Sequence, residues 1–164
     1  YIEPVPKYAH RCRERHASNQ GVVVSQCAIG AEPRVVSIHV AGPLSTIRDD
    51  AKRNFESLEW AADLFAGERI EAEQTTLEAY LREYAIEAGF ELLVVDVEGS
   101  EWDVFRNFDL RKWQPLMVIV ELHDQNDDYL FLRDECNHIV RYFRDNGYRS
   151  IYKDSSNTVY VRSP

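Results

Sequence analysis

The 164-residue sequence has little positive charge, and this shortage excludes one class of partner. Its 19 lysine and arginine residues stand against 28 aspartate and glutamate residues, which gives a formal net charge of -9 at pH 7. A protein that binds nucleic acid needs a basic patch to neutralise phosphates, and a chain this acidic offers none. We therefore expect no nucleic-acid partner.

Long apolar runs and a cysteine framework are also missing. The apolar runs at residues 92–95 and 116–120 are far shorter than the roughly 20 residues that cross a bilayer, and the opening residues do not have the order of a secretory signal. The cysteines, Cys12, Cys27 and Cys136, are odd in number and widely spaced, as is typical of reduced thiols. These absences predict a cytoplasmic protein without a membrane partner.

What is present favours one α/β domain over residues 1–164. A hydrophobic content of 45% is enough for a single core. Periodicity and turn residues predict helices at residues 7–16, 49–65, 77–88 and 132–145, with a short one after Ser100 as N-cap. They predict strands at residues 22–29, 34–40, 70–74, 92–96, 116–121, 149–153 and 158–162. Strands that alternate with helices indicate one mostly parallel sheet, here with an antiparallel C-terminal hairpin.

Three details of this prediction are local. Residues 22–29 and 34–40 are expected to pair as a hairpin through residues 31–33, and the Thr75-Thr76-Leu77-Glu78 sequence matches a capping box at the start of a helix. Residues 92–95 are apolar throughout, which is typical of a parallel strand covered on both faces. The chain opens on Tyr1 within what reads as the end of a strand, so we expect a segment upstream of it.

Polar residues that directly follow apolar strands are the candidate functional residues, because ligands bind beyond the carboxyl ends of strands in open α/β sheets. Glu3 ends the opening strand, where a carboxylate can accept both hydroxyls of a ribose. Asp96 and Glu98 point the same way from an extended segment, and Gly99 lets a ligand approach the backbone. The alternatives are structural: Glu3 is a solvated strand end, and Asp96 or Glu98 caps the next helix.

Glu121 and His123 follow the next predicted strand. An imidazole titrates near neutral pH, so His123 is a candidate general base, although a lone histidine more often has a structural role. Together with Asp96 and Glu98, these residues offer ligands for one divalent metal, but no ligand spacing requires it. The prediction is therefore of a site without a metal.

These residues also carry a resemblance to a known family. The stretch LLVVDVEGSEWDVFRNFDL, followed by QPLMVIVELHD, resembles the central signature of FkbM-type methyltransferases. Ile2-Glu3-Pro4 resembles the Glu-Pro of the family's second strand, residues 25–30 resemble its next strand, and residues 75–78 resemble its Thr-Thr-Leu-Asp. Asn146-Gly147-Tyr148 and the closing hairpin resemble its C-terminal end. The resemblance extends over nearly the whole chain in the expected order.

The resemblance implies a Rossmann-like methyltransferase sheet and S-adenosylmethionine as cofactor. It implies that Glu3, Pro4, Asp96 and Gly99 bind this cofactor, that Asp96, Glu98 and His123 are catalytic, and that the acceptor is a hydroxyl of a sugar or natural product. The first strand and the family's glycine-rich turn, Asp-x-Gly-Ala-(polar)-x-Gly, would precede Tyr1, and none of the seven glycines forms a substitute.

Two functions of other classes remain as alternatives. The first is a non-catalytic α/β interaction domain that keeps the methyltransferase sheet, which the missing glycine-rich turn favours. The second is a metal-dependent hydrolase that uses the acidic residues. The retained Glu3, Asp96, Glu98, Glu121 and His123 argue against the interaction domain. No nucleophile motif or metal-ligand spacing accompanies the acidic residues, which argues against the hydrolase. The methyl acceptor and the oligomeric state stay open.

Overall fold

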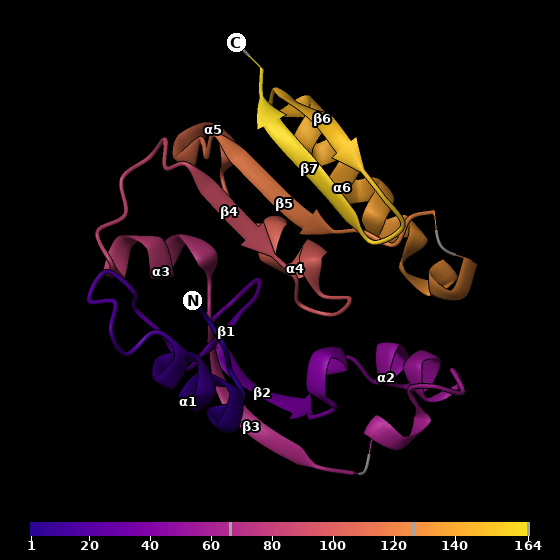
Figure 1. Ribbon diagram of the computed structural model, residues 1–164. Coiled ribbons are helices and arrows are strands. Elements are labelled where there is room, and N and C mark those ends of the chain that lie inside the picture. Colours follow the sequence, from indigo (N-terminus) through magenta and orange to yellow (C-terminus); the bar gives the residue numbers. More distant parts are fainter. Residues whose placement is uncertain (66, 126, 164) are drawn as a thin grey trace.

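The computed structural model describes residues 1–65, 67–125 and 127–163, and it shows a mixed α/β protein (Figure 1). Its strands are β1 (Ala28–Ile29), β2 (Arg34–His39), β3 (Arg69–Thr75), β4 (Leu92–Val95), β5 (Met117–Glu121), β6 (Tyr148–Lys153) and β7 (Asn157–Arg162). Its α-helices are α1 (Pro6–Arg15), α2 (Asp49–Glu56), α3 (Leu77–Glu83), α4 (Glu101–Phe105), α5 (Leu110–Trp113) and α6 (Arg133–Asp145). Short 3-10 helices span Gly42–Leu44, Ala62–Leu64 and Asp127–Leu132.

The described strands form two separate sheets, which makes the prediction of one sheet wrong. The N-terminal sheet has the order β1-β3-β2, with β1 parallel and β2 antiparallel to β3. The C-terminal sheet has the order β4-β5-β7-β6 and is parallel only between β4 and β5. Both sheets are therefore mixed, and the mostly parallel sheet is not confirmed. The parallel β4–β5 pair and the closing β6–β7 hairpin are confirmed.

Two apolar cores hold the sheets to their helices. In the larger one, α4 packs on α6, and both cover the face of the C-terminal sheet that presents the buried side chains of Val118, Val120 and Tyr160 (Figure 1). Phe143 of α6 is fully buried, with its ring stacked 4.3 Å from that of Tyr160. The smaller core fixes α1 on the N-terminal sheet through Val5, Ala28, Val36, Ile38 and Val40.

Residues 22–29 show the largest departure from the predicted strands. Only Ala28 and Ile29 form a strand, and Ser25 makes an isolated parallel bridge with Ile2. The predicted hairpin is also wrong, because β3 lies between β1 and β2. A β-branched run predicts an extended chain but not its partner, and most of this run finds no neighbouring strand among the described residues.

The predicted helices begin correctly, and two of them end early. The helix predicted at residues 49–65 ends at Glu56. The helix predicted at residues 77–88 ends at Glu83, and its N-cap is Thr76, whose hydroxyl accepts a hydrogen bond from the Ala79 amide at 3.1 Å. Ser100 is the N-cap of α4 without a side-chain capping bond.

One face and one edge of the C-terminal sheet are open. Leu92 and Val94 of β4 are 49% and 58% exposed, so the expectation that helices cover both faces of this strand is wrong for the described residues. No described strand pairs with the β4 edge that faces away from β5. Within the described ranges, no helix is long and apolar enough to span a membrane.

Candidate active site at the ends of β4 and β5

The parallel pairing of β4 and β5 brings their exit residues together. Val95 lies opposite Val120, so Asp96 and Glu121 leave the sheet at the same edge, and Glu98 follows two residues after Asp96. One carboxylate oxygen from each of Asp96, Glu98 and Glu121 lies within 4.8 Å of the other two. We call these three residues the acid cluster. The predicted parallel pairing brings Asp96 and Glu121 together, whereas Glu98 departs from the extended path expected for it, with a φ of 52°. The cluster suits either a shared proton or a cation.

His123 lies beside the acid cluster, on the side of Glu121. Its Nε2 atom is 3.2 Å from Oε1 of Glu121, and its ring stacks on Tyr129 with the centroids 3.8 Å apart. Burial lowers the pKa of His123, but the hydrogen bond to Glu121 and the charges of Glu121 and Glu101 outweigh it, so the pKa is raised above its ordinary value. The structure therefore groups His123 with the three acids, in contact with Glu121.

The chain turns sharply at Glu98 and Gly99, which we call the 98–99 turn. Both residues have left-handed backbone angles, with φ of 52° for Glu98 and 92° for Gly99. Such angles are strained for glutamate and easy for glycine. The carboxylate of Glu101 accepts hydrogen bonds from the Val97 amide at 3.1 Å and from the Gly99 amide at 3.2 Å. The buried Glu101 thus stabilises the turn by accepting hydrogen bonds from its amides.

Proximity and burial favour the neutral form of the acids. Burial, followed by the charges of Glu121, Asp96 and Glu101, raises the pKa of Glu98 to about 9. Asp96 opens to solvent, yet partial enclosure and the charge of Glu121 raise its pKa to about 6. Burial also raises the pKa of Glu101 to about 7. At neutral pH, Asp96 is mostly ionised while Glu98 holds its proton, so the two carboxyls are suited to different roles.

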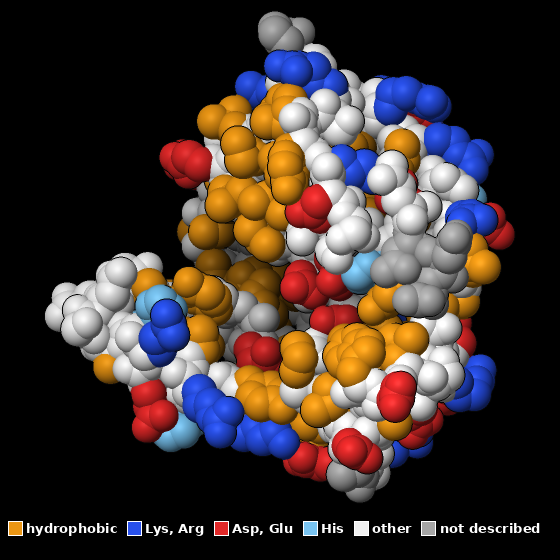
Figure 2. Space-filling view, turned by 45° about the vertical axis from the view of Figure 1, so that its right-hand side comes forward, with side chains coloured by type: hydrophobic (Ala, Val, Ile, Leu, Met, Phe, Trp, Pro, Cys, Tyr) orange, Lys and Arg blue, Asp and Glu red, His pale blue; other side chains and the backbone are white. Residues whose placement is uncertain are grey.

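A groove of about 1130 Å³ runs between the two sheets and reaches the acid cluster. Glu3 and Pro4 line it from the segment that precedes α1, while Asp96 and Glu98 line it from the end of β4. Figure 2 shows the groove as a hollow with apolar side chains along its walls and acidic side chains at its inner end. The structure therefore brings Glu3, in the segment before α1, to the same groove as Asp96 and Glu98.

Residues of the site differ in their access to this groove. Asp96 is exposed, Glu98 is half-buried, and His123 is buried. Gly99 is also buried, and a side chain there would meet Leu132 and Ala51 rather than the groove. Glu121, His123 and Gly99 are not among the groove-lining residues. A ligand in the groove would therefore meet Asp96 and Glu98 first, with Glu121 and His123 behind them.

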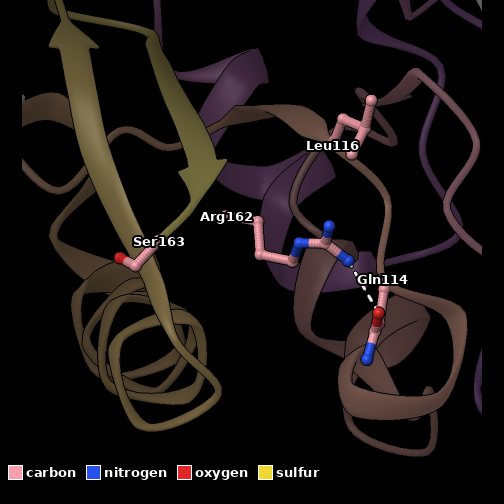
Figure 3. A pocket seen from close by; sticks show the side chains of 4 residues that line it. All are labelled: Gln114, Leu116, Arg162 and Ser163. Carbon is pink, nitrogen blue, oxygen red and sulfur yellow. Dashed lines mark hydrogen bonds between the residues drawn. The ribbon is translucent and has the colours of Figure 1, made fainter.

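A second, smaller hollow lies at the opposite end of β5. Gln114, Leu116, Arg162 and Ser163 line it, and Arg162 donates a hydrogen bond to the Gln114 side chain at 2.6 Å across it (Figure 3). The side chains of Arg162 and Gln114 in this hollow are already hydrogen-bonded to each other. The acid cluster lies at the other end of β5. The groove between the sheets is the better candidate site.

Two buried polar side chains in the groove were not found by sequence reasoning. Oγ of Ser100 and Oε1 of Gln74 are buried, and neither has a hydrogen-bond partner among the described residues. Buried polar atoms without partners are costly, so each is suited to a ligand group. Ser100 stands within the Asp-Val-Glu-Gly-Ser-Glu stretch, which was a usable signal, whereas Gln74 lies in an ordinary strand pattern.

The fold and the site together define an α/β protein with a cluster of carboxyls where two parallel strands end. The sequence profile of the Methyltransferase FkbM domain matches residues 1–150. This match spans most of the chain, and the chain therefore belongs to the FkbM methyltransferase family. No curated protein sequence matches the chain significantly.

A solved structure supports the fold. The crystal structure of methyltransferase FkbM from Methylobacillus flagellatus KT superposes with a TM-score of 0.51 at 14% sequence identity. The alignment covers 98% of this chain and 35% of that one, so the chain spans about a third of the length of this relative. At such low identity the likeness concerns the fold alone.

Proposed function

We propose that the chain is part of an S-adenosylmethionine-dependent methyltransferase that transfers a methyl group to a hydroxyl of a sugar or natural product. Family membership supports methyl transfer. The observation that carries the proposal is the groove itself, which places Glu3 on one wall and Asp96 and Glu98 on the other. A carboxylate for a ribose and a carboxylate for a proton thus face one ligand site.

The described residues fit this cofactor in two respects. Glu3 accepts a hydrogen bond from the Val5 amide at 2.8 Å, which fixes its carboxylate at the groove. The buried Ser100 and Gln74 oxygens lack partners, and hydroxyl and amino groups of a nucleoside would supply them. The groove volume of about 1130 Å³ is above the usual range for small-ligand pockets, so a ligand of nucleoside size fits within it.

The protein's part in this reaction is to align two substrates and to accept one proton. When bound, S-adenosylmethionine supplies a methyl group on a sulfonium that is already activated for displacement. Asp96 is exposed in the groove and mostly ionised at neutral pH, so in our proposal it takes the proton of the acceptor hydroxyl. In this proposal Glu98 stays protonated and donates a hydrogen bond to the bound ligand. His123 contacts Glu121 and so affects the charge of the acid cluster without touching the ligand.

Calorimetric titration with S-adenosylmethionine tests the cofactor half of this proposal. The protein that carries the expected upstream segment should bind it, and Glu3→Gln should weaken binding by about 1 to 3 kcal/mol through loss of charge-assisted hydrogen bonds. Glutamine keeps an acceptor for the Val5 amide, so the wall of the groove stays intact. The matched control is Glu73→Gln, which changes an exposed glutamate of β3.

Equal affinity in the Glu3 variant would refute the role of Glu3. The chain without an upstream segment should bind weakly or not at all. Affinity equal to that of the longer protein would contradict the need for a glycine-rich turn. Absence of binding to the longer protein would favour the non-catalytic α/β interaction domain.

A further inference from the structure

Two residues of the segment that follows β2 bind the backbone of the 98–99 turn. The hydroxyl of Thr46 donates a hydrogen bond to the carbonyl of Glu98 at 2.9 Å, and Nη1 of Arg48 donates one to the carbonyl of Gly99 at 2.9 Å. Thr46 and Arg48 thus bind the carbonyls of this turn, and Glu101 binds its Gly99 amide, although the turn contains two residues with left-handed backbone angles. Strained backbone persists only where the surroundings hold it.

Both residues are themselves firmly placed. Thr46 is 1% exposed, and its backbone forms an antiparallel bridge with His39 at the end of β2. The Arg48 guanidinium forms ion pairs with Asp50 at 2.6 Å and with Glu135 of α6 at 2.6 Å. Thr46 therefore connects the turn to the N-terminal sheet, and Arg48 connects it to α2 and α6.

We propose that Thr46 and Arg48 are positioning residues that hold the 98–99 turn so that the Asp96 and Glu98 carboxyls meet Glu121 at the groove. Without these contacts, Glu98 gains by relaxing to a right-handed conformation, which swings its carboxyl out of the cluster. The effect on the turn stands by itself, whereas its consequence for methyl transfer rests on the proposed function.

Amide hydrogen exchange, followed by NMR, tests the effect on the turn. Thr46→Val removes the hydroxyl without changing the shape of the side chain, and Arg48→Met removes the guanidinium. Both should speed exchange at the Val97 and Gly99 amides by about tenfold or more, and the amides of β5 and β7 should keep their rates. Thr46→Ser, which keeps the hydroxyl, should restore slow exchange.

Glu135→Gln is the matched control, because glutamine removes a charge beside Arg48 but still accepts a hydrogen bond from it, and the contact with Gly99 is left in place. It should leave exchange in the turn close to that of the wild type. Unchanged exchange in both the Thr46→Val and Arg48→Met variants would overturn the proposal. Uniform acceleration across β5 and β7 would also overturn it, since it would mean general destabilisation.

Two further measurements separate positioning from simple support. Carboxyl NMR should show the pKa of Glu98 falling towards an ordinary glutamate value in Thr46→Val, and an unchanged value would contradict the grouping of the carboxyls by Thr46. In the longer protein, turnover should fall by about 10-fold or more while affinity for S-adenosylmethionine stays constant. If the wild type transfers no methyl group, the proposed function fails, and the exchange data still decide the positioning role.

Discussion

Replacing Glu98 with glutamine should stabilise the protein, because the present side chain must take up a proton on folding. Its folded-state pKa is raised to about 9 from an ordinary 4.5. At pH 7 the unfolded chain has lost this proton and the folded chain keeps it, which costs about 3 kcal/mol at about 1.4 kcal/mol per pKa unit. The side chain is half-buried, so solvent screening lowers the expected stabilisation to about 2 kcal/mol.

The stabilisation should depend on pH in a defined direction. Between the unfolded and folded pKa values, the folded state binds more protons than the unfolded state, so stability falls as pH rises. Below this window both states are protonated, and the gain from Glu98→Gln should vanish. It should grow with pH up to about 9, where the folded carboxyl also ionises.

Urea unfolding at about pH 4.5, 7 and 9 measures this difference, with ΔG taken from linear extrapolation. Glutamine keeps the size of the side chain and the left-handed backbone angle, so only the carboxyl changes. Glu73→Gln is the control, because it removes an exposed carboxylate from β3. A gain that is independent of pH, or a loss of stability at neutral pH, would refute the assignment of a half-buried, protonated Glu98.

Three other predictions concern the acid cluster and the core. Asp96→Asn should lower methyl transfer by about 10² to 10⁴-fold. The wild-type rate should rise with pH through about 6 as Asp96 ionises. If His123→Gln shows this loss and Asp96→Asn stays active, His123 is the base instead. Activity should survive a chelator, and a loss restored by added Mg²⁺ would show that the cluster holds a cation. Phe143→Ala should cost about 3 to 5 kcal/mol in urea unfolding, because its ring is fully buried against Phe105 and Tyr160, and a cost below about 1 kcal/mol would contradict this packing.

The central part of the fold was predictable because local and long-range signals agree there. The apolar runs of β4 and β5 are each followed by acidic residues, and the intervening segment is long enough for a parallel crossover. The parallel pairing, the approach of Asp96 to Glu121 and the position of His123 beside them follow from this. Glu98 joins them through a left-handed turn in place of the extended segment expected there. The β6–β7 hairpin was predictable for the same reason, since turn residues join two strand-like runs.

The N-terminal sheet was predicted poorly because strand pairing is not encoded in local pattern. Residues 22–29 read as a strand as strongly as β4 does, yet Val23 is 51% exposed and only the end of the run pairs with β3. An extended chain becomes a strand when a neighbour supplies hydrogen bonds, and that neighbour can lie far away in the sequence. In the order β1-β3-β2, β1 pairs with the distant β3 rather than with β2, which follows it in the sequence.

The contacts of Thr46 and Arg48 lay beyond sequence reasoning for a similar reason. They reach Glu98 and Gly99 from about fifty residues away, through hydrogen bonds to backbone carbonyls, which any residue presents. No residue type at position 98 or 99 points to a hydroxyl or a guanidinium elsewhere. The Asp-Val-Glu-Gly-Ser-Glu stretch indicated where the chemistry lies, and the tertiary structure shows what holds it.

The 98–99 turn also offers an argument for function that does not depend on the family. A left-handed backbone angle favours glycine or asparagine at position 98, and burial beside other acids favours a neutral side chain there. Glutamate meets neither preference, so this position carries a backbone cost and a proton-uptake cost together. Natural proteins keep such costs at sites where activity requires them. A Glu98→Asn variant that gains stability and loses methyl transfer would show this exchange directly, while a variant that keeps full activity would leave the choice of glutamate without a functional reason.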